Sequence, residues 1–187
     1  MGDAELLDRI ARIEDRLEID QLPIRYALAV DSRDVDSWLE LFVPDVRVGR
    51  EATGREALRE FITPRLRWFY RSIHQLVGHR VELLGPDTAR GQVYCRAEHE
   101  VGERWVVMAI RYDDDYRKVD GQWLFNRRRE NHWYAADVTD RPQSVAFDGW
   151  DASSGPPNLP GPAATWSAFW AGHDTSEITG APVHVLP

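Results

Sequence analysis

The sequence predicts an α+β fold in which an antiparallel sheet curls over N-terminal helices. Two observations predict it. Apolar residues recur with helical spacing through the first third of the chain, and from residue 73 their period changes to two. Turn-forming segments such as "VDGQW" divide this second region into strands. The length of 187 residues is typical of one main domain.

The first helix is expected from Ala4 to about Arg33. Pro23 interrupts it, so we expect a kink or two helices that meet there. Continuing the apolar stripe by three residues places Asp31 on the core face. The stripe consists of Ile10, Ile13, Leu17, Ile24 and Leu28.

Shorter elements follow this helix. Asp34 or Asp36 is expected to cap a second helix at "SWLELF". The segment "VPDVRVG" is typical of a short strand, and residues 54–71 of an amphipathic helix broken near Pro64. Four strands are then predicted, at 73–84, 88–101, 104–119 and 122–135.

A different composition begins near residue 140. We predict a main domain over 1–139 and a C-terminal arm over 140–187, because the segment "GPPNLPGPAATWSAFWAG" is rich in Pro, Gly and Trp and is not expected to form a regular element. The arm is either a flexible terminus or a segment packed on the domain or on a neighbouring subunit. Packing would bury Trp150, Trp166 and Trp170.

Composition excludes several classes of function. The net charge of −8 argues against nucleic-acid binding, because phosphates would be repelled. No apolar run has the length of a signal peptide or a membrane span. The single cysteine, Cys95, excludes an internal disulfide and fits the cytoplasm.

Motifs for metals and cofactors are also missing from the sequence. There is no HExxH, no paired cysteines, no glycine-rich phosphate loop and no GxSxG. We therefore expect acid–base chemistry that needs no cofactor and no metal.

Asp31 is the first candidate for such chemistry. An aspartate in "DSRDVD" is often only a turn or capping residue. A carboxylate among apolar residues, however, has a raised pKa and needs a partner, as a catalytic base does.

Histidine is the natural partner. His99 shares a strand face with apolar residues, as a core histidine also would. His74 and His79 lie five residues apart and face opposite ways on a regular strand, where parity favours His79 for the core unless a bulge intervenes. His132 is a candidate for an interface. In "NRRRE", strand alternation puts Arg128 on the face opposite to Arg127 and Arg129, so at least one of these arginines is expected to face a pocket.

Three long segments resemble the SnoaL-like group of the nuclear-transport-factor-2-like superfamily. They are "YALAVDSRDVDSWLELFVPDVRVG", "SIHQLVGHRVELLGPDTARGQVYCRAEHEV" and "YRKVDGQWLFNRRRENHW". The resemblance covers about residues 5–137 and implies a cone-shaped barrel of strongly bent sheet with a deep apolar pocket. The likeness is greatest to cofactor-independent eliminating enzymes: scytalone dehydratase, bile-acid 7α-dehydratase and hexachlorocyclohexane dehydrochlorinase.

The resemblance implies roles for four residues. Asp31 occupies the position of an aspartate that orients a histidine, and His74 that of the histidine base. His99 matches a second pocket histidine, and Tyr26 a catalytic tyrosine. Two tyrosines of scytalone dehydratase are replaced here by Val30 and Arg50, and an asparagine by Tyr112, which implies a different substrate. Substrate-binding residues are expected to be Trp38, Phe42, Trp68, Phe69, Tyr112 and Arg128.

The resemblance thus implies a dehydratase-type lyase that acts on a bulky, apolar, oxygenated ring compound such as a polyketide, terpenoid or steroid. Two alternatives stay open. One is an isomerase or cyclase with the same base, and the other is a non-catalytic subunit like the β subunit of aromatic-ring dioxygenases, which "DVDSWLELFVPDV" also resembles. A homotrimer or homodimer is expected.

Overall fold

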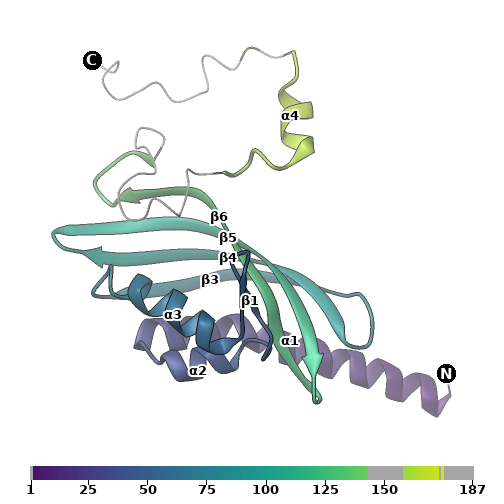
Figure 1. The fold of residues 1–187 in the computed structure, drawn as a ribbon. Coiled ribbons are helices and arrows are strands. Elements are labelled where there is room, and N and C mark those ends of the chain that lie inside the picture. Colours follow the sequence, from purple (N-terminus) through teal and green to yellow (C-terminus); the bar gives the residue numbers. More distant parts are fainter. Residues whose placement is uncertain (1, 143–157, 173, 175–187) are drawn as a thin grey trace.

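Helices cover one face of a long, curved antiparallel sheet in the computed structural model, which describes residues 2–142, 158–172 and 174 (Figure 1). The fold class predicted from the sequence is therefore confirmed, although the sheet stays open and does not close into a barrel. The elements are α1 (Asp3–Ser32), α2 (Val35–Glu40), β1 (Arg47–Val48), β2 (Ala52–Thr53), α3 (Arg55–Leu66), β3 (Ser72–Leu83), β4 (Thr88–Val101), β5 (Arg104–Val119), β6 (Gln122–Asp137) and α4 (Ala164–Trp170).

The main sheet has the order β3-β4-β5-β6, so each strand pairs with its neighbour in sequence. All three pairings are antiparallel, and β1 and β2 form a separate small ribbon. The four strands begin and end within two residues of the predicted bounds. β3 and β6 lie at opposite edges of this sheet.

A β-bulge in β3 settles which histidines face inward. The register with β4 shifts between Leu76 and Gly78, so Val77 is an extra residue, and its side chain points to solvent. Because the bulge reverses the alternation of faces, the side chains of both His74 and His79 lie on the inner face. The parity argument that favoured only His79 was wrong for this reason.

The buried face of α1 is not the one that the sequence predicted. The predicted stripe is exposed, to 61% at Leu17 and 65% at Leu28, whereas Ile19, Leu22 and Ala27 are among the buried residues. Two apolar faces run along this helix, and only one packs on the sheet. Asp31 lies one turn beyond Ala27, at the margin of the buried face, rather than at the end of the predicted stripe.

Proline does not divide the helices as expected. α1 continues as one helix through Pro23, whose side chain is fully buried, and α3 contains Pro64 and ends two residues after it. Burial of the Pro23 ring against the core offsets the backbone hydrogen bond that a proline cannot donate. Asp34 caps α2 by accepting a hydrogen bond from the backbone N–H of Ser37, which confirms one of the two predicted caps.

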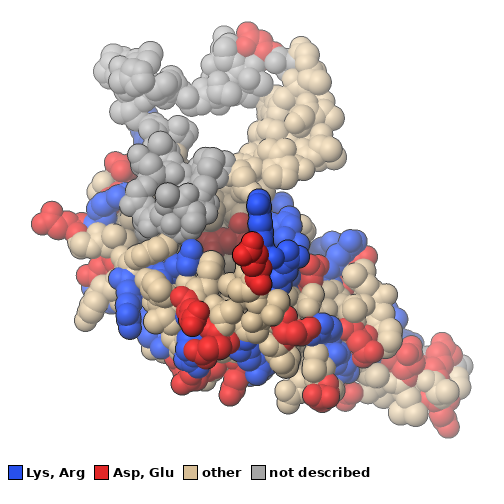
Figure 2. Space-filling model, in the orientation of Figure 1, with Lys and Arg blue, Asp and Glu red and all other residues tan. Residues whose placement is uncertain are grey.

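The C-terminal arm contains a short helix, contrary to the expectation that its composition forms no regular element. α4 buries none of its residues and presents an uncharged surface (Figure 2), and Trp166 is 47% exposed. Before α4, the backbone N–H groups of Asn158 and Leu159 donate to the carbonyl of His132. Trp150 lies outside the described residues, and the division at residue 139 stays a prediction. In the part of the chain that the structure describes, no helix is long and apolar enough to cross a bilayer.

Deleting Val77 is expected to destabilise the protein by about 2–4 kcal/mol, because loss of the bulge forces either His74 or His79 to the outer face. The Val77→Ala variant is the control. It keeps the bulge and removes only an exposed side chain, so its free energy of unfolding should lie within about 0.5 kcal/mol of the wild type. Urea unfolding measures both, and a deletion variant as stable as the alanine variant would contradict the prediction.

Candidate active site

A pocket of about 470 Å³ opens between the helices and the inner face of the sheet. Nine of the residues that the sequence singled out line it: Tyr26, Trp38, Phe42, Trp68, Phe69, His74, His99, Tyr112 and Arg128. Asp31 is hydrogen-bonded to one of them, His74. The structure thus brings all ten residues to one cavity, and their chemical roles stay predictions.

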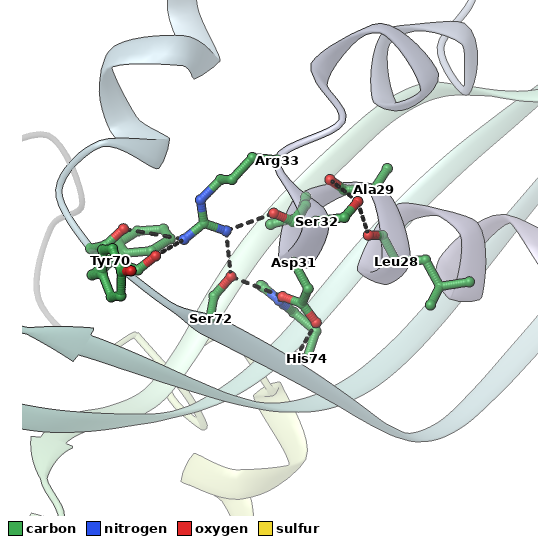
Figure 3. Close-up of polar contacts among 10 residues, drawn as sticks. Leu28, Ala29, Asp31, Ser32, Arg33, Tyr70, Ser72 and His74 are labelled. Carbon is green, nitrogen blue, oxygen red and sulfur yellow. Dashed lines mark hydrogen bonds and ion pairs between the residues drawn. The ribbon is translucent and has the colours of Figure 1, made fainter.

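Asp31 is joined to β3 by three hydrogen bonds (Figure 3). Its Oδ1 lies 2.7 Å from Nδ1 of His74 and accepts from Oγ of Ser72 at 2.9 Å. Its Oδ2 accepts from the backbone N–H of His74, also at 2.9 Å. These hydrogen bonds join the end of α1 to the start of β3, and they hold the carboxylate and the imidazole in a fixed orientation.

The pKa of Asp31 is lowered, not raised as expected. Burial raises the pKa, but the hydrogen bonds from the His74 side chain and backbone and from Ser72 outweigh burial. The carboxylate is therefore ionised and can only accept. Nδ1 of His74 must then carry the hydrogen, which leaves Nε2 as the basic nitrogen.

Arg33 braces this arrangement and was missed by the sequence analysis. It ends α1 in the left-handed conformation, with a φ of 62°. Its guanidinium donates to Oγ of Ser72 at 2.8 Å and to the backbone carbonyls of Phe69 and Tyr70, just before β3 (Figure 3). Ser72 is thus linked to both Asp31 and Arg33, and the short segment "DSR" does more than end a helix.

His79 serves the core rather than the pocket. Its Nδ1 lies 2.9 Å from Asp20 of α1, and its Nε2 lies 3.0 Å from the hydroxyl of Tyr116. That hydroxyl donates to Oδ2 of Asp114. The bulge therefore gives β3 one histidine for the pocket and another for a buried polar chain.

His99 is a neutral histidine of the pocket wall. Its ring lies 5.7 Å from that of His74 and 4.4 Å from that of Phe69, measured between centroids. Burial, with a smaller contribution from His74, lowers the pKa of His99 to about 3. At neutral pH it carries no charge and offers one N–H donor and one acceptor nitrogen.

Arg128 is buried among aromatic rings. Its Cζ lies 4.4 Å from the ring centroid of Tyr26, 4.2 Å from that of Tyr112 and 4.3 Å from that of Phe125, which are cation–π distances. Nε and Nη2 donate to the two carboxylate oxygens of Asp114, at 2.8 and 2.7 Å. Burial lowers the pKa of Arg128, but Asp114 raises it on balance, so the guanidinium stays charged.

One nitrogen of Arg128 has no partner in this arrangement. Nη1 is buried and has no hydrogen-bond partner within the described residues. Such a group normally has a partner. Nη1 itself exposes almost no surface to the pocket, so the charge of the guanidinium, rather than this N–H group, is what reaches a bound ligand.

Glu130 and His132 form a second carboxylate–histidine pair in the pocket lining, and the sequence analysis missed it. Nε2 of His132 lies 2.6 Å from Oε1 of Glu130. The register between β5 and β6 shifts between Asp115 and Tyr116, so Asn126 is an extra residue, and Arg128, Glu130 and His132 follow it on the inner face. A bulge is hard to place from sequence, and without it alternation from Phe125 predicts the opposite face.

The SnoaL-like domain family matches residues 11–129. An uncharacterised protein of Mycobacterium tuberculosis H37Rv is 32% identical in an alignment of 137 positions that covers 67% of this chain and 92% of that protein.

Solved structures show the same fold. A hexachlorocyclohexane dehydrochlorinase from Novosphingobium barchaimii LL02 superposes with a TM-score of 0.62 at 21% identity, over 71% of this chain and 96% of the enzyme. A scytalone-dehydratase-like protein from Novosphingobium aromaticivorans DSM 12444 does so with a TM-score of 0.62 at 21% identity, over 72% and 94% of the two chains. At this identity the likeness establishes the fold alone.

The Asp114→Asn substitution should cost about 3–5 kcal/mol of stability, because it leaves the buried Arg128 guanidinium without its counter-ion. The control is Asp115→Asn. Asp115 is exposed on the opposite face of the same strand, so this change should stay within about 0.5 kcal/mol of the wild type. Urea unfolding distinguishes them, and equal effects would contradict the buried pair.

Asp31 should stabilise the protein in a pH-dependent way. Because its pKa in the folded state lies below the ordinary value of 3.8, its contribution is present above about pH 4 and is lost as the pH falls through the folded pKa. Asp31→Asn should therefore lose about 1–3 kcal/mol at pH 7 and progressively less below pH 4. Urea unfolding of both proteins between pH 7 and pH 2.5 measures this, and a constant difference would contradict it.

Proposed function

We propose that this chain, which belongs to the SnoaL-like domain family, is a cofactor-independent lyase of the dehydratase type. The hydrogen-bonded pair of Asp31 and His74 in an aromatic-lined pocket is the observation that carries the proposal. The fold that it shares with a dehydrochlorinase and a dehydratase-like protein supports it.

His74 is the base in this proposal. The ionised Asp31 holds the hydrogen on Nδ1 and stabilises the positive charge that the imidazole gains when Nε2 takes a proton. The proton comes from a carbon next to a carbonyl, where the electron pair left behind spreads onto the carbonyl oxygen. As the carbon–oxygen bond to the leaving hydroxyl breaks, this pair forms the new double bond.

The departing hydroxyl needs a proton, and Tyr26 and His99 are the candidates for its donor. Burial raises the pKa of Tyr26 to about 12, so the phenol keeps its hydrogen at neutral pH. The ring of Tyr26 lies 6.5 Å from that of His74. His99 is neutral and also carries one hydrogen.

Arg128 is suited to stabilise the negative charge that develops on the carbonyl oxygen. It keeps a positive charge in an apolar setting, where charge stabilisation is stronger than in water. Two of its nitrogens are held by Asp114, and Nη1 is buried without a partner among the described residues, so the guanidinium acts on the ligand through its charge. The aromatic walls, which include Trp38, Phe42 and Phe69, fit a bulky apolar ring compound.

The same base also suits an isomerase or cyclase, which would return the proton to another atom or form a carbon–carbon bond without losing water. The third alternative is a non-catalytic subunit. Such a subunit has no need for an oriented histidine base beside a buried cation, so the geometry favours an enzyme. A homodimer or homotrimer and a cytoplasmic location stay predictions.

Exchange of α-protons tests the base independently of any leaving group. In D2O, the wild-type protein should exchange the α-hydrogens of 1-tetralone, an aromatic ketone, faster than buffer does. The Asp31→Asn and His74→Ala variants should lower this rate by about 10²–10⁴-fold. Proton NMR follows the exchange, and thermal unfolding checks that the variants fold.

Asp36→Asn is the matched control, because Asp36 is close to Asp31 in sequence but lies on the exposed surface of α2. The exchange rate of this variant should equal that of the wild type. Exchange by Asp31→Asn at the wild-type rate would refute the proposal. With 3-hydroxy-1-tetralone, formation of 1-naphthol supports the lyase. Exchange without loss of water favours the isomerase or cyclase, and a wild-type protein that exchanges neither ketone favours the non-catalytic subunit.

A further inference from the structure

Glu130 brings a negative charge into the pocket from the edge of the sheet opposite to His74. His74 belongs to β3 and Glu130 to β6, which are the two edge strands. Both line the same pocket. The carboxylate of Glu130 is bound through Oε1 to His132, while 44% of the side-chain surface stays accessible.

The carboxylate of Glu130 is ionised. Burial raises its pKa, but the hydrogen bond and charge of His132, with smaller contributions from His74 and His99, lower the pKa on balance. An ionised carboxylate only accepts hydrogen bonds. Within the described residues only Oε1 receives a hydrogen bond, and the accessible side chain leaves Oε2 to water in the free protein. A ligand that displaces this water must supply a donor in its place.

The C-terminal arm fixes the strand segment that carries this pair. Oδ1 of Asn158 accepts from the backbone N–H of His132, and its Nδ2 donates to Oδ1 of Asn131, each at 2.9 Å. The register of β6 shifts at this place, where Trp133 is an extra residue between the partners of Ala109 and Ile110. Asn158 therefore holds a bulged segment, whose backbone conformation the sheet alone does not determine.

We propose that Glu130 is a substrate-positioning residue that accepts a hydrogen bond from a hydroxyl group which the substrate keeps through the reaction, and that Asn158 positions Glu130 through His132. The inference rests on the proposed function in taking this pocket as the substrate site. The substrate class is thereby narrowed to hydroxylated ring compounds, with phenols included.

The hydroxyl that Glu130 binds is not the one that leaves. A leaving hydroxyl gains negative charge as its bond to carbon breaks, and an ionised carboxylate would oppose that charge. The departing oxygen needs a donor, and Tyr26 and His99 offer hydrogens. A retained hydroxyl or phenol instead donates to the carboxylate throughout, so Glu130 suits binding and orientation.

Binding of matched ketones tests the proposal. The probes are 1-tetralone and its 5-, 6- and 7-hydroxy isomers, titrated by isothermal calorimetry. The wild type should bind at least one hydroxy isomer about tenfold more tightly than 1-tetralone, as expected for a hydrogen bond to a charged group. Glu130→Ala should reduce this ratio to about two while leaving the affinity for 1-tetralone unchanged. If that variant does not fold, Glu130→Gln should still reduce the ratio, because a neutral acceptor forms a weaker bond.

Glu82→Gln is the matched control. Glu82 lies on β3 and pairs with Arg90 outside the pocket, so this variant should keep the full preference. Asn158→Ala should lower the ratio without weakening the binding of 1-tetralone, whereas a merely structural role would weaken both ligands alike. The proposal is overturned if no hydroxy isomer binds the wild type more tightly than 1-tetralone, or if Glu130→Ala keeps the preference.

The Asp31→Asn variant separates this inference from the proposed function. It should retain the hydroxyl preference, because Asp31 contacts β3 and not Glu130, while it loses proton exchange. If the wild type prefers a hydroxy isomer but does not exchange the α-hydrogens, the role of Glu130 is supported and the role of His74 as a base is refuted. Exchange without the preference refutes Glu130 alone.

Discussion

The bonds between the Asp31 carboxylate and the first residues of β3 are the interaction on which the site depends. α1 and β3 are far apart in sequence, and these bonds join the end of one to the start of the other. They fix the rotation of the His74 ring and the protonation of its two nitrogens at once. Arg33 extends the same junction by binding Ser72 and the carbonyls that precede β3, so a local turn in sequence becomes a rigid corner of the pocket.

Three charged side chains in or beside the pocket are held in pairs. Asp31 is matched with His74, Arg128 with Asp114, and Glu130 with His132. Each pairing lowers the free-energy cost of placing a charge in apolar surroundings. In the proposed mechanism, Nε2 of His74 takes the proton, the charge of Arg128 acts on the carbonyl oxygen, and Oε2 of Glu130 accepts from a retained hydroxyl. Under that proposal one molecule meets a base, a cation and an anionic acceptor, which is a more specific demand on the substrate than an apolar cavity makes.

The sequence predicted the fold class and the four long strands well, because a period of two dominates each strand outside its bulges and a clear turn follows each of the first three. It failed on the packing of α1. Two apolar faces compete on that helix, and the sequence does not say which one the sheet covers, so the expected stripe at Leu17 and Leu28 is exposed. The stripe that was expected to place Asp31 on the core face is the exposed one, and Asp31 lies at the margin of the other face. Its partner came from resemblance, because strand parity alone disfavoured His74.

Bulges explain why alternation in the sequence could not predict which face of the edge strands carries the other site residues. In each edge strand an extra residue, Val77 in β3 and Asn126 in β6, exchanges the inner and outer faces. Beyond Asn126 lie Arg128 and Glu130, and before Val77 lies His74. An edge strand tolerates such an insertion because only one side of it is paired. The same tolerance lets both edge strands depart from strict alternation where they meet the pocket, which brings His74 and Glu130 there. The central strand β4 keeps its alternation and contributes His99.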